Sequence, residues 1–328
     1  MSVKVSVIVP VYGVEKYMER CARSLFAQTL DHVEFLFIDD CTPDRSMEIL
    51  QAEIERHRDI IAEQHWDVRT YRMHENSGQA AVRKQGISMA TGQYIAHCDS
   101  DDWVEPTIYE KLYNKASAEN LDILWCDFYS SDGVKSIRCN TLQNTKISKK
   151  RVFDAMFCDN TATHSLWAAL VSARLYSKEI LFPTHNIGED NVFMAQLLFF
   201  ADTIGYLPEP LYYYYQNPGS IMHPQTVEKR WNNFWQSKKN RDIVIEFFEN
   251  YNLPEKYTTF QKLSARFELE NLRNEKNFKS VWHSTYPELE GHILFNTEIP
   301  FRHRVKYFLM ESGLHKWFYN LFRKISKI

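Results

Sequence analysis

Residues 99–102 place three carboxylates within four positions, Asp99, Asp101 and Asp102, with Ser100 between them. Like charges this close repel one another unless a cation neutralises them. Oxygen ligands suit Mg²⁺ or Mn²⁺, and Mg²⁺ typically takes one or two carboxylates together with substrate phosphates. The tetrad therefore predicts a divalent-cation site. The alternative is a solvated acidic turn that caps a helix starting near Glu105.

Two further polar segments follow apolar runs that have the composition of strands. Pro10 and Tyr12 end the run VKVSVIVPVY, and Asp39 and Asp40 follow the run EFLFI. A single acid after a strand is usually only a helix cap. Ligands of open parallel sheets bind at the carboxyl ends of the strands. Three polar strand ends at one rim therefore favour a ligand site over three unrelated caps.

The elements that must position these residues alternate between strand-like and helix-like patterns. Their order predicts a parallel sheet with helices on both faces. The expected strands are 3–12, 34–38, 68–72, 93–98, 122–129 and 211–215. The expected helices are 14–28, 45–58, 78–90, 106–120, 152–157, 167–176 and 189–200, and the chain from 227 onward. Residues 135–150 are polar and predict a hairpin or loop.

Composition excludes several classes of protein. Of 328 residues, 44% are hydrophobic and 25% charged, as in soluble globular proteins, and only 10 are glycine, which disfavours several glycine-rich phosphate loops. The net charge of −3 argues against a nucleic-acid binder. The six cysteines form no Cys-x-x-Cys pair, which predicts reduced thiols in a cytoplasmic protein. We see no secretory signal and no apolar run long enough to span a membrane.

Six segments in order resemble the family 2 glycosyltransferases of the GT-A fold. They are SVIVPVYGVEKYMERCARSLFAQTL, EFLFIDDCTPDRS, NSGQAAVRKQGISMATGQYIAHCDSDDWVEP, LWAALVSARLYSKEILFP, GEDNVF and PLYYYYQNPGSI. The resemblance covers residues 1–222. It implies a GT-A domain there, with a Rossmann-like, mostly parallel sheet flanked by helices, followed by a helical C-terminal region over 223–328.

The resemblance also implies a function. Such enzymes use a divalent cation, Mn²⁺ or Mg²⁺, to transfer a sugar with inversion from a nucleotide-diphosphate donor. We expect a UDP-sugar donor and a hydroxyl acceptor on a glycan or a lipid-linked saccharide, in cell-surface polysaccharide synthesis.

Site roles follow from the resemblance, residue by residue. Pro10 and Tyr12 would line the nucleobase pocket, with the Tyr12 ring against the base. Asp40 would accept a hydrogen bond from a uracil ring, and Asp39 would support the same wall. Arg83 would contact the nucleotide near its diphosphate, where a fixed cation is useful.

The remaining roles concern the metal and the base. Asp99 would lie by the ribose or the metal, beside Ser100 on the nucleotide-sugar side, and Asp101 would ligate the metal. Asp190 would be the general base, with Glu189 next in line. An acidic first turn of a helix is the alternative for these two residues.

The sequence departs from the family pattern at turns beside the expected nucleotide. Gly13 stands where many relatives carry Asn, Cys41 and Thr42 stand where many carry Gly and Ser, and Lys84 replaces a commoner Asn. These changes weaken any assignment of the base. His223 could reach the diphosphate, although a solvated loop histidine is the simpler interpretation.

Three other functions remain to be compared. A nucleotidyltransferase that makes sugar nucleotides needs a glycine-rich, basic loop after the first strand, and the sequence there is VYGVE. An inactive binding protein of the same fold is disfavoured because Asp101 and Asp190 are both present. An NAD-dependent dehydrogenase would need Gly-x-Gly-x-x-Gly after that strand.

The last residues form a separate pattern. Between Pro300 and Ile328 seven Lys or Arg side chains accompany one acid, Glu311. From Leu314 on, helical spacing separates an apolar arc from a basic one, which is typical of a helix lying on an anionic membrane. We therefore expect residues 301–328 to hold a cytoplasmic protein at the inner face of the plasma membrane. Docking on its own domain, or on a second copy in a homo-oligomer, is the alternative.

Overall fold

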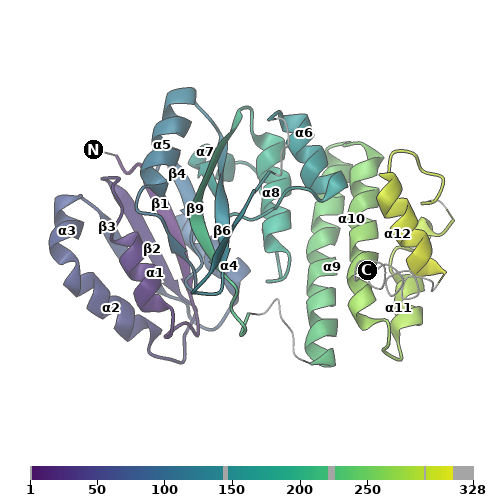
Figure 1. Ribbon diagram of the computed structural model, residues 1–328, viewed down its shortest axis with the longest axis horizontal. Coiled ribbons are helices and arrows are strands. Elements are labelled where there is room, and N and C mark those ends of the chain that lie inside the picture. The colour runs from purple at the N-terminus through teal and green to yellow at the C-terminus, as the bar shows by residue number, and fades with distance from the viewer. Residues whose placement is uncertain (1, 143–146, 221–225, 292, 313–328) are drawn as a thin grey trace.

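The computed structural model describes residues 2–142, 147–220, 226–291 and 293–312. It has a sheet with its helices at one end and a stack of helices at the other (Figure 1). The sheet order is β3-β2-β1-β4-β8-β6-β9-β5, with β7 paired to β6. The fold is mixed α/β, as the sequence predicted.

The first half of the sheet is parallel, in the order of a nucleotide-binding fold. Its strands are β1 (Val5–Val11), β2 (Val33–Asp39), β3 (Asp67–Arg72) and β4 (Tyr94–His97). Strand β1 lies between β2 and β4 and is almost wholly buried, as its unbroken apolar run requires. Its side chains pack alternately into two clusters: Val7 and Val9 join the larger core, and Ile8 packs with Val82.

Four helices connect the parallel strands of this half: α1 (Met18–Leu25), α2 (Ser46–Arg56), α3 (Arg58–Glu63) and α4 (Gln79–Met89). Helix α5 (Ile108–Glu119) comes later in the chain and leads into the second half of the sheet. Helix α1 buries Cys21 and Leu25 in the larger core, and α4 packs on β1 and β2 in the smaller cluster. The two faces of the sheet are therefore covered by different helices.

The second half of the sheet is mixed. It contains β5 (Trp103–Val104), β6 (Ile123–Ser131), β7 (Ser136–Cys139), β8 (Ala169–Ser172) and β9 (Ile204–Tyr215). Strands β6 and β9 are parallel, whereas β8 runs antiparallel to both β4 and β6. The polar segment 135–150 contains β7, which forms a hairpin with β6.

The predicted helix over 167–176 was wrong. Residues 169–172 form a central strand, and only α7 (Ala173–Tyr176) is helical. The segment is apolar at nearly every position because a central strand is buried on both faces. Such a short run cannot be distinguished from a buried helix by its periodicity.

The rest of the described chain is mainly helical. Helix α6 (Lys149–Asp154), the π-turn η1 (Ala155–Asp159) and α8 (Glu189–Phe200) lie between strands. After residue 226 come α9 (Val227–Asn250), α10 (Glu255–Glu268), η2 (Leu269–Leu272), α11 (Phe278–Ser284), η3 (Pro287–Leu289) and α12 (Phe301–Glu311). Helix α9 packs on α8, which joins this region to the sheet. Within the described ranges, no helix is both long and apolar enough to cross a membrane.

A buried arginine holds the C-terminal helices together. Arg266 of α10 is fully buried and donates hydrogen bonds to the carbonyls of Thr285 and Tyr286 and to the Tyr307 hydroxyl. Its guanidinium lies 5.4 Å from the centre of the Trp282 ring. One side chain therefore connects α10, the segment after α11, and α12.

Gly78 joins two distant parts of the chain. It precedes α4 with φ of +82°, and the side chain of Asn186, in the loop before α8, packs against it. A Cβ atom at Gly78 would lie 2.5 Å from Asn186 Oδ1, which also accepts a hydrogen bond from the Ala80 amide. A glycine is therefore required here for both its backbone angle and the close approach.

We expect Gly78→Ala to destabilise the protein more than Gly291→Ala. Gly291 has a similar φ of +78° but nothing within 4 Å of the added Cβ. Both changes place a side chain in the left-handed region, at about 1–2 kcal/mol, and only the first adds a steric clash. Urea unfolding of both variants measures the difference. Equal losses would show that Asn186 simply moves aside.

Candidate active site

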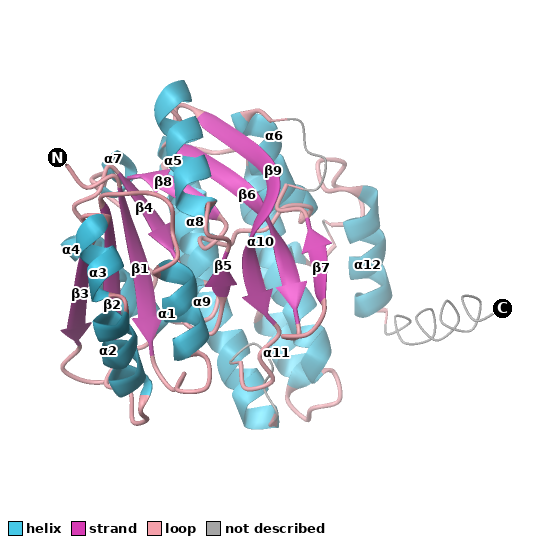
Figure 2. Ribbon diagram, turned by 60° about the vertical axis from the view of Figure 1, so that its left-hand side comes forward, coloured by secondary structure: helices cyan, strands magenta, loops and turns pink. Residues whose placement is uncertain are grey.

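Three strand ends meet at one rim, as the sequence predicted. In the parallel register Val11 pairs with Asp39 and Ile8 with His97, so the residues after β1, β2 and β4 emerge side by side (Figure 2). Pro10 is partly buried, and the Tyr12 side chain is exposed. An aromatic ring is therefore open to solvent at this rim, with acids beside it.

The two acids after β2 shape the neighbouring turns. Asp39 accepts hydrogen bonds from the Thr42 amide at 2.7 Å and from Arg72 at 2.7 Å. The two oxygens of Asp40 accept the amides of Ser77 and Gly78, at 2.7 and 2.8 Å. Asp40 therefore fixes the turn that starts α4. Its role toward a uracil ring stays a prediction.

Cys41 stands where the sequence resemblance implies glycine, and the structure shows how a side chain is accommodated. Its φ is +57°, in the left-handed region that glycine favours. The thiol donates a hydrogen bond to the Met73 carbonyl at 3.0 Å. The turn therefore keeps a glycine-like backbone with a cysteine in it.

The acidic tetrad divides into residues that face inward and residues that face the rim. Asp102 is fully buried and accepts the Tyr212 hydroxyl and the Tyr215 amide, both at 2.7 Å. Burial and the charges of Asp101 and Asp99 raise the pKa of Asp102 well above its ordinary value. Ser100 is also buried, whereas Asp99 and Asp101 keep partial exposure. Asp102 is therefore a structural residue.

Asp101 is held by two segments that are distant in sequence. Asn217 donates to one of its carboxylate oxygens at 2.9 Å, and Arg20 of α1 donates to its backbone carbonyl at 2.8 Å. The Arg20 guanidinium lies 3.7 Å from the centre of the Trp103 ring, a cation–π contact. Burial and the charge of Asp99 raise the pKa of Asp101, while Asn217 opposes that rise.

Arg83 of α4 lies under the rim and faces three acids. Its side chain is 1% exposed and donates to Asp99 at 2.8 Å. Its guanidinium nitrogens lie 3.8 Å from Glu189 and 3.6 Å from Asp190, both in the first turn of α8. The strand-end acid and the α8 acids therefore share one cation. A direct contact of Arg83 with a nucleotide stays a prediction.

The two acids of α8 have strongly shifted acidities. Burial and the charge of Asp190 raise the pKa of Glu189 to about 8. Burial raises the pKa of Asp190 to about 6, with Arg83 limiting the rise. Both carboxyls therefore keep their protons to a higher pH than exposed carboxyls do. A carboxylate with a pKa near the working pH suits a general base.

One carboxylate oxygen of Asp190 is buried beside Arg83. Oxygen Oδ1 is buried without a hydrogen-bond partner and faces Arg83. The side chain as a whole is 25% exposed, and a hydrogen bond from the backbone of Leu166 lowers the pKa of its carboxyl. The carboxylate of Asp190 is thus partly exposed at the site and lies near a buried cation.

An aromatic wall beside the acids was not assigned from the sequence. Trp167 stacks on Tyr212 and Tyr214, with ring centres 4.6 and 5.4 Å apart. Burial and the charges of Asp102, Asp99, Asp101 and Asp190 raise the pKa of Tyr214, so this hydroxyl senses the same acids. The run of tyrosines after residue 211 was the available signal, but it did not show which rings face the site.

One histidine-containing cluster of the described residues lies apart from this site. His223 falls outside the described residues. Within the described ranges, the trio His283, Glu290 and Glu311 brings three potential metal-ligating atoms together. Arg266 lies 3.7 Å from Glu290 and 3.8 Å from Glu311, so these acids already face a cation.

Comparison with known proteins identifies relatives of this chain. The family model "Glycosyl transferase family 2" matches residues 6–181. The uncharacterized glycosyltransferase EpsJ of Bacillus subtilis is 30% identical over 259 residues, which cover 76% of this chain and 71% of EpsJ. In three further curated glycosyltransferases, the matched region covers 31%, 62% and 63% of the relative.

Solved structures share the fold. Staphylococcus aureus TarS (1–349) in complex with UDP-GlcNAc has a TM-score of 0.61 at 19% identity, covering 90% of this chain and 76% of that one. Mannosyltransferase PcManGT of Pyrobaculum calidifontis, in complex with GDP-Man and Mn²⁺, has a TM-score of 0.52 at 14% identity, covering 100% of this chain and 84% of that one. The GT-A fold that the sequence predicted is confirmed.

The shared cation gives a stability prediction. In the folded chain Glu189 and Asp190 have pKa values raised to about 8 and 6, above ordinary values of 4.5 and 3.8. The folded chain therefore keeps protons that the unfolded chain releases, and these acids lower its stability as pH rises from about 4 to 8. Arg83 opposes this loss by stabilising the ionised forms.

We therefore expect Arg83→Met to destabilise the protein by about 3–5 kcal/mol at pH 8, the usual range for a broken buried ion pair. The loss should be smaller at pH 5, where both acids are protonated. Urea unfolding at the two pH values measures it. The control is Arg72→Met, which breaks the ion pair with Asp39 at the same rim. The Arg72 side chain is 63% exposed. An Arg83 loss independent of pH would refute the shared-cation arrangement.

Proposed function

Since this chain belongs to glycosyl transferase family 2, we propose that it transfers a sugar, with inversion, from a nucleotide-diphosphate sugar to an acceptor hydroxyl. The observation that carries this proposal is the position of Asp190. Its carboxylate has a pKa raised to about 6 and lies 3.6 Å from the arginine that also binds Asp99 at the strand-end rim. A base is thereby placed beside the expected donor site.

The residues suggest how the reaction proceeds. The ionised carboxylate of Asp190 takes the proton of the acceptor hydroxyl as the hydroxyl oxygen bonds to the anomeric carbon. The bond from this carbon to the diphosphate breaks on the opposite side, so the configuration inverts. Arg83 favours the ionised form of Asp190, because its charge limits the rise of that pKa. Removing the hydroxyl proton in this way is general-base catalysis.

The rim fits a divalent cation. Asp99 and Asp101 are half-buried carboxylates two positions apart, and burial with the charge of Asp99 raises the pKa of Asp101. A cation would relieve this repulsion, and oxygen ligands suit Mg²⁺ or Mn²⁺. Asp101, with Asp99 beside it, would hold the ion, which when bound would stabilise charge on the leaving diphosphate. PcManGT, which shares the fold, was solved with Mn²⁺.

The donor and acceptor are narrower proposals. A UDP-sugar is the favoured donor, since TarS, solved with UDP-GlcNAc, shares the fold. Pro10, Tyr12, Asp39 and Asp40 at the rim would then hold the base. A glycan or lipid-linked acceptor, and a role in cell-surface polysaccharide synthesis, stay predictions. An inactive binding protein of this fold is the alternative that the following experiments address.

The donor screen tests the activity. Purified protein with Mn²⁺ is offered UDP-, GDP- and dTDP-sugars, and release of the nucleoside diphosphate is followed. We expect release from a UDP-sugar, stimulated by a saccharide acceptor. Tight nucleotide binding by calorimetry without release from any donor or acceptor would favour the inactive binding protein.

The metal assignment is tested on Asp101. We expect Asp101→Ala to abolish turnover and to weaken Mn²⁺ binding, measured by electron paramagnetic resonance in the presence of UDP. The control is Asp59→Ala, because that side chain is 99% exposed and lies away from the rim. Chelation should silence the wild type. Full activity in EDTA would remove the metal from the proposal.

The base is tested by pH and by matched amides. Because Asp190 must be ionised, kcat/KM should fall about tenfold per unit as pH drops below about 6. Asp190→Asn should reduce transfer by about 10²–10⁴-fold and leave UDP binding intact. Glu189→Gln imitates the protonated acid and should stay within about tenfold of the wild type. If Glu189→Gln reduced transfer more than Asp190→Asn, Glu189 would be the general base.

A further inference from the structure

One part of the surface collects more exposed apolar side chains than its length explains. Thirteen large apolar residues are exposed in the described chain, and five of them fall between residues 294 and 308. These five are Leu294, Phe295, Phe301, Val305 and Phe308. We call them the α12 patch. Exposed apolar side chains gathered in one short segment typically mark an interaction site.

The patch lies on the outward face of a docked helix. In α12 the inward residues Tyr307 and Met310 are 3% exposed and pack in the C-terminal core. Phe301, Val305 and Phe308 are spaced i, i+4 and i+7, which places them on one stripe of the helix. Phe301 is 72% and Phe308 45% exposed. Helix α12 is therefore apolar on two faces, and only one of them has a partner in the described chain.

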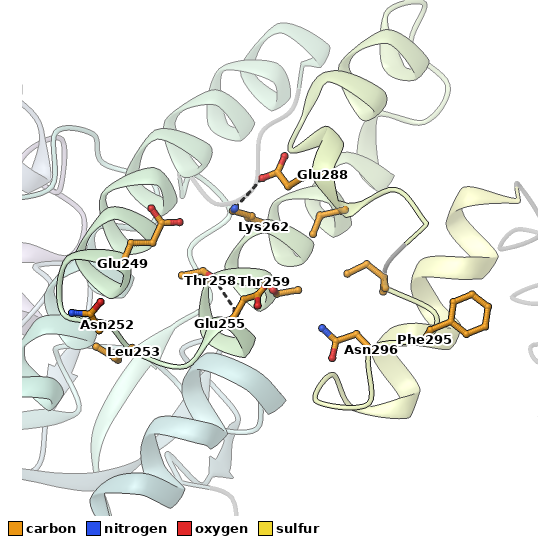
Figure 3. A pocket seen from close by; sticks show the side chains of 12 residues that line it. Glu249, Asn252, Leu253, Glu255, Thr258, Thr259, Lys262, Glu288, Phe295 and Asn296 are labelled. Atoms are coloured by element: carbon orange, nitrogen blue, oxygen red, sulfur yellow. Dashed lines mark hydrogen bonds and ion pairs between the residues drawn. The ribbon is translucent and has the colours of Figure 1, made fainter.

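The loop before α12 lies beside this helix. Arg304 donates a hydrogen bond to the Leu294 carbonyl, which holds this loop beside the helix. Phe295 borders a pocket of about 800 Å³ between α9, α10 and the segment 288–296, but its ring points away from that pocket (Figure 3). The ring is 83% exposed. Phe295 therefore adds a ring to the outer surface and does not fill the pocket.

Cationic residues flank the apolar stripe. At 100° per residue Arg302 and Arg304 fall on opposite sides of the line through Phe301, Val305 and Phe308. Each donates a hydrogen bond to a backbone carbonyl, Arg302 to Asp159 and Arg304 to Leu294, and a guanidinium has five N–H donors in all. The Arg304 guanidinium lies 5.6 Å from the centre of the Phe301 ring. The sequence that continues beyond the described residues, 313–328, adds Lys316, Arg323, Lys324 and Lys327 and no acid. Rings between cations suit a surface that is apolar below a layer of anions.

We infer that the α12 patch docks on an anionic lipid bilayer, with its rings in the headgroup boundary and its arginines on lipid phosphates. A protein partner would also cover rings, but the basic flanks and the basic continuation favour an anionic surface. The inference concerns the C-terminal helices and does not depend on the proposed activity.

Co-sedimentation with vesicles tests the inference. Full-length protein should bind vesicles of equal parts phosphatidylglycerol and phosphatidylcholine and not phosphatidylcholine alone. Raising the salt from about 0.1 M to about 1 M shortens the Debye length from about 10 Å to about 3 Å, and should release most of the protein. Phe301→Ser with Phe308→Ser should lower the partition coefficient at least tenfold.

Matched variants separate the α12 patch from other causes. Val134→Ser with Ile137→Ser removes side chains that are 91% and 70% exposed on the β6–β7 hairpin, and should not change binding. A chain that ends at Ser312 should keep part of the vesicle binding. Adding Phe301→Ser and Phe308→Ser to this shortened chain should remove the binding that remains. Circular dichroism melting confirms that each variant is folded.

Two outcomes would overturn the inference. One is anionic-vesicle binding that the Phe301 and Phe308 changes leave intact. The other is absence of vesicle binding in the full-length chain, including the case where sedimentation equilibrium shows a dimer that the same changes dissociate.

Discussion

The site depends on one buried cation. Arg83 is almost completely buried and faces Asp99, Glu189 and Asp190 within 4 Å. A charge at this depth is tolerated only when acids surround it, and these acids remain there only because the cation is present. The start of α8 is thereby tied to the end of β4. Two elements about ninety positions apart in the chain (Asp99 and Asp190) become one rim through a single side chain.

The rest of the rim is built from acids that act as scaffolding. Both oxygens of Asp40 accept hydrogen bonds from the backbone amides before α4, and the oxygens of Asp102 accept hydrogen bonds from two tyrosines of β9. These carboxylates accept the hydrogen bonds of donors that water would otherwise satisfy. The backbone around the site is therefore fixed before any ligand binds. Asp99, Asp101 and Asp190 keep the exposure that contact with a substrate requires. A crowded acidic rim thus separates into carboxylates that bond the backbone and carboxylates that remain partly exposed.

The sequence could predict the parallel half of the sheet because its strands and helices alternate with distinct periods. It could also predict the rim, since three polar segments follow buried strands. It could not identify β8, whose unbroken apolar run carries no period. It also could not show that Asp102 points inward, because its partner Tyr212 is 110 positions away. Both the β8 strand and the direction of the Asp102 side chain depend on pairing between residues that are far apart in the sequence. Local sequence patterns do not report such pairing.

The reversed direction of β8 gives the fold a way to diversify. Because β8 is antiparallel to β4, the residues that precede it, including Trp167, arrive at the rim where the parallel strands end. The segment leading into β8 follows η1. Changes of length or sequence there would reshape the aromatic wall without altering the strands that carry the acids. This one connection can therefore vary independently of the acidic half of the rim.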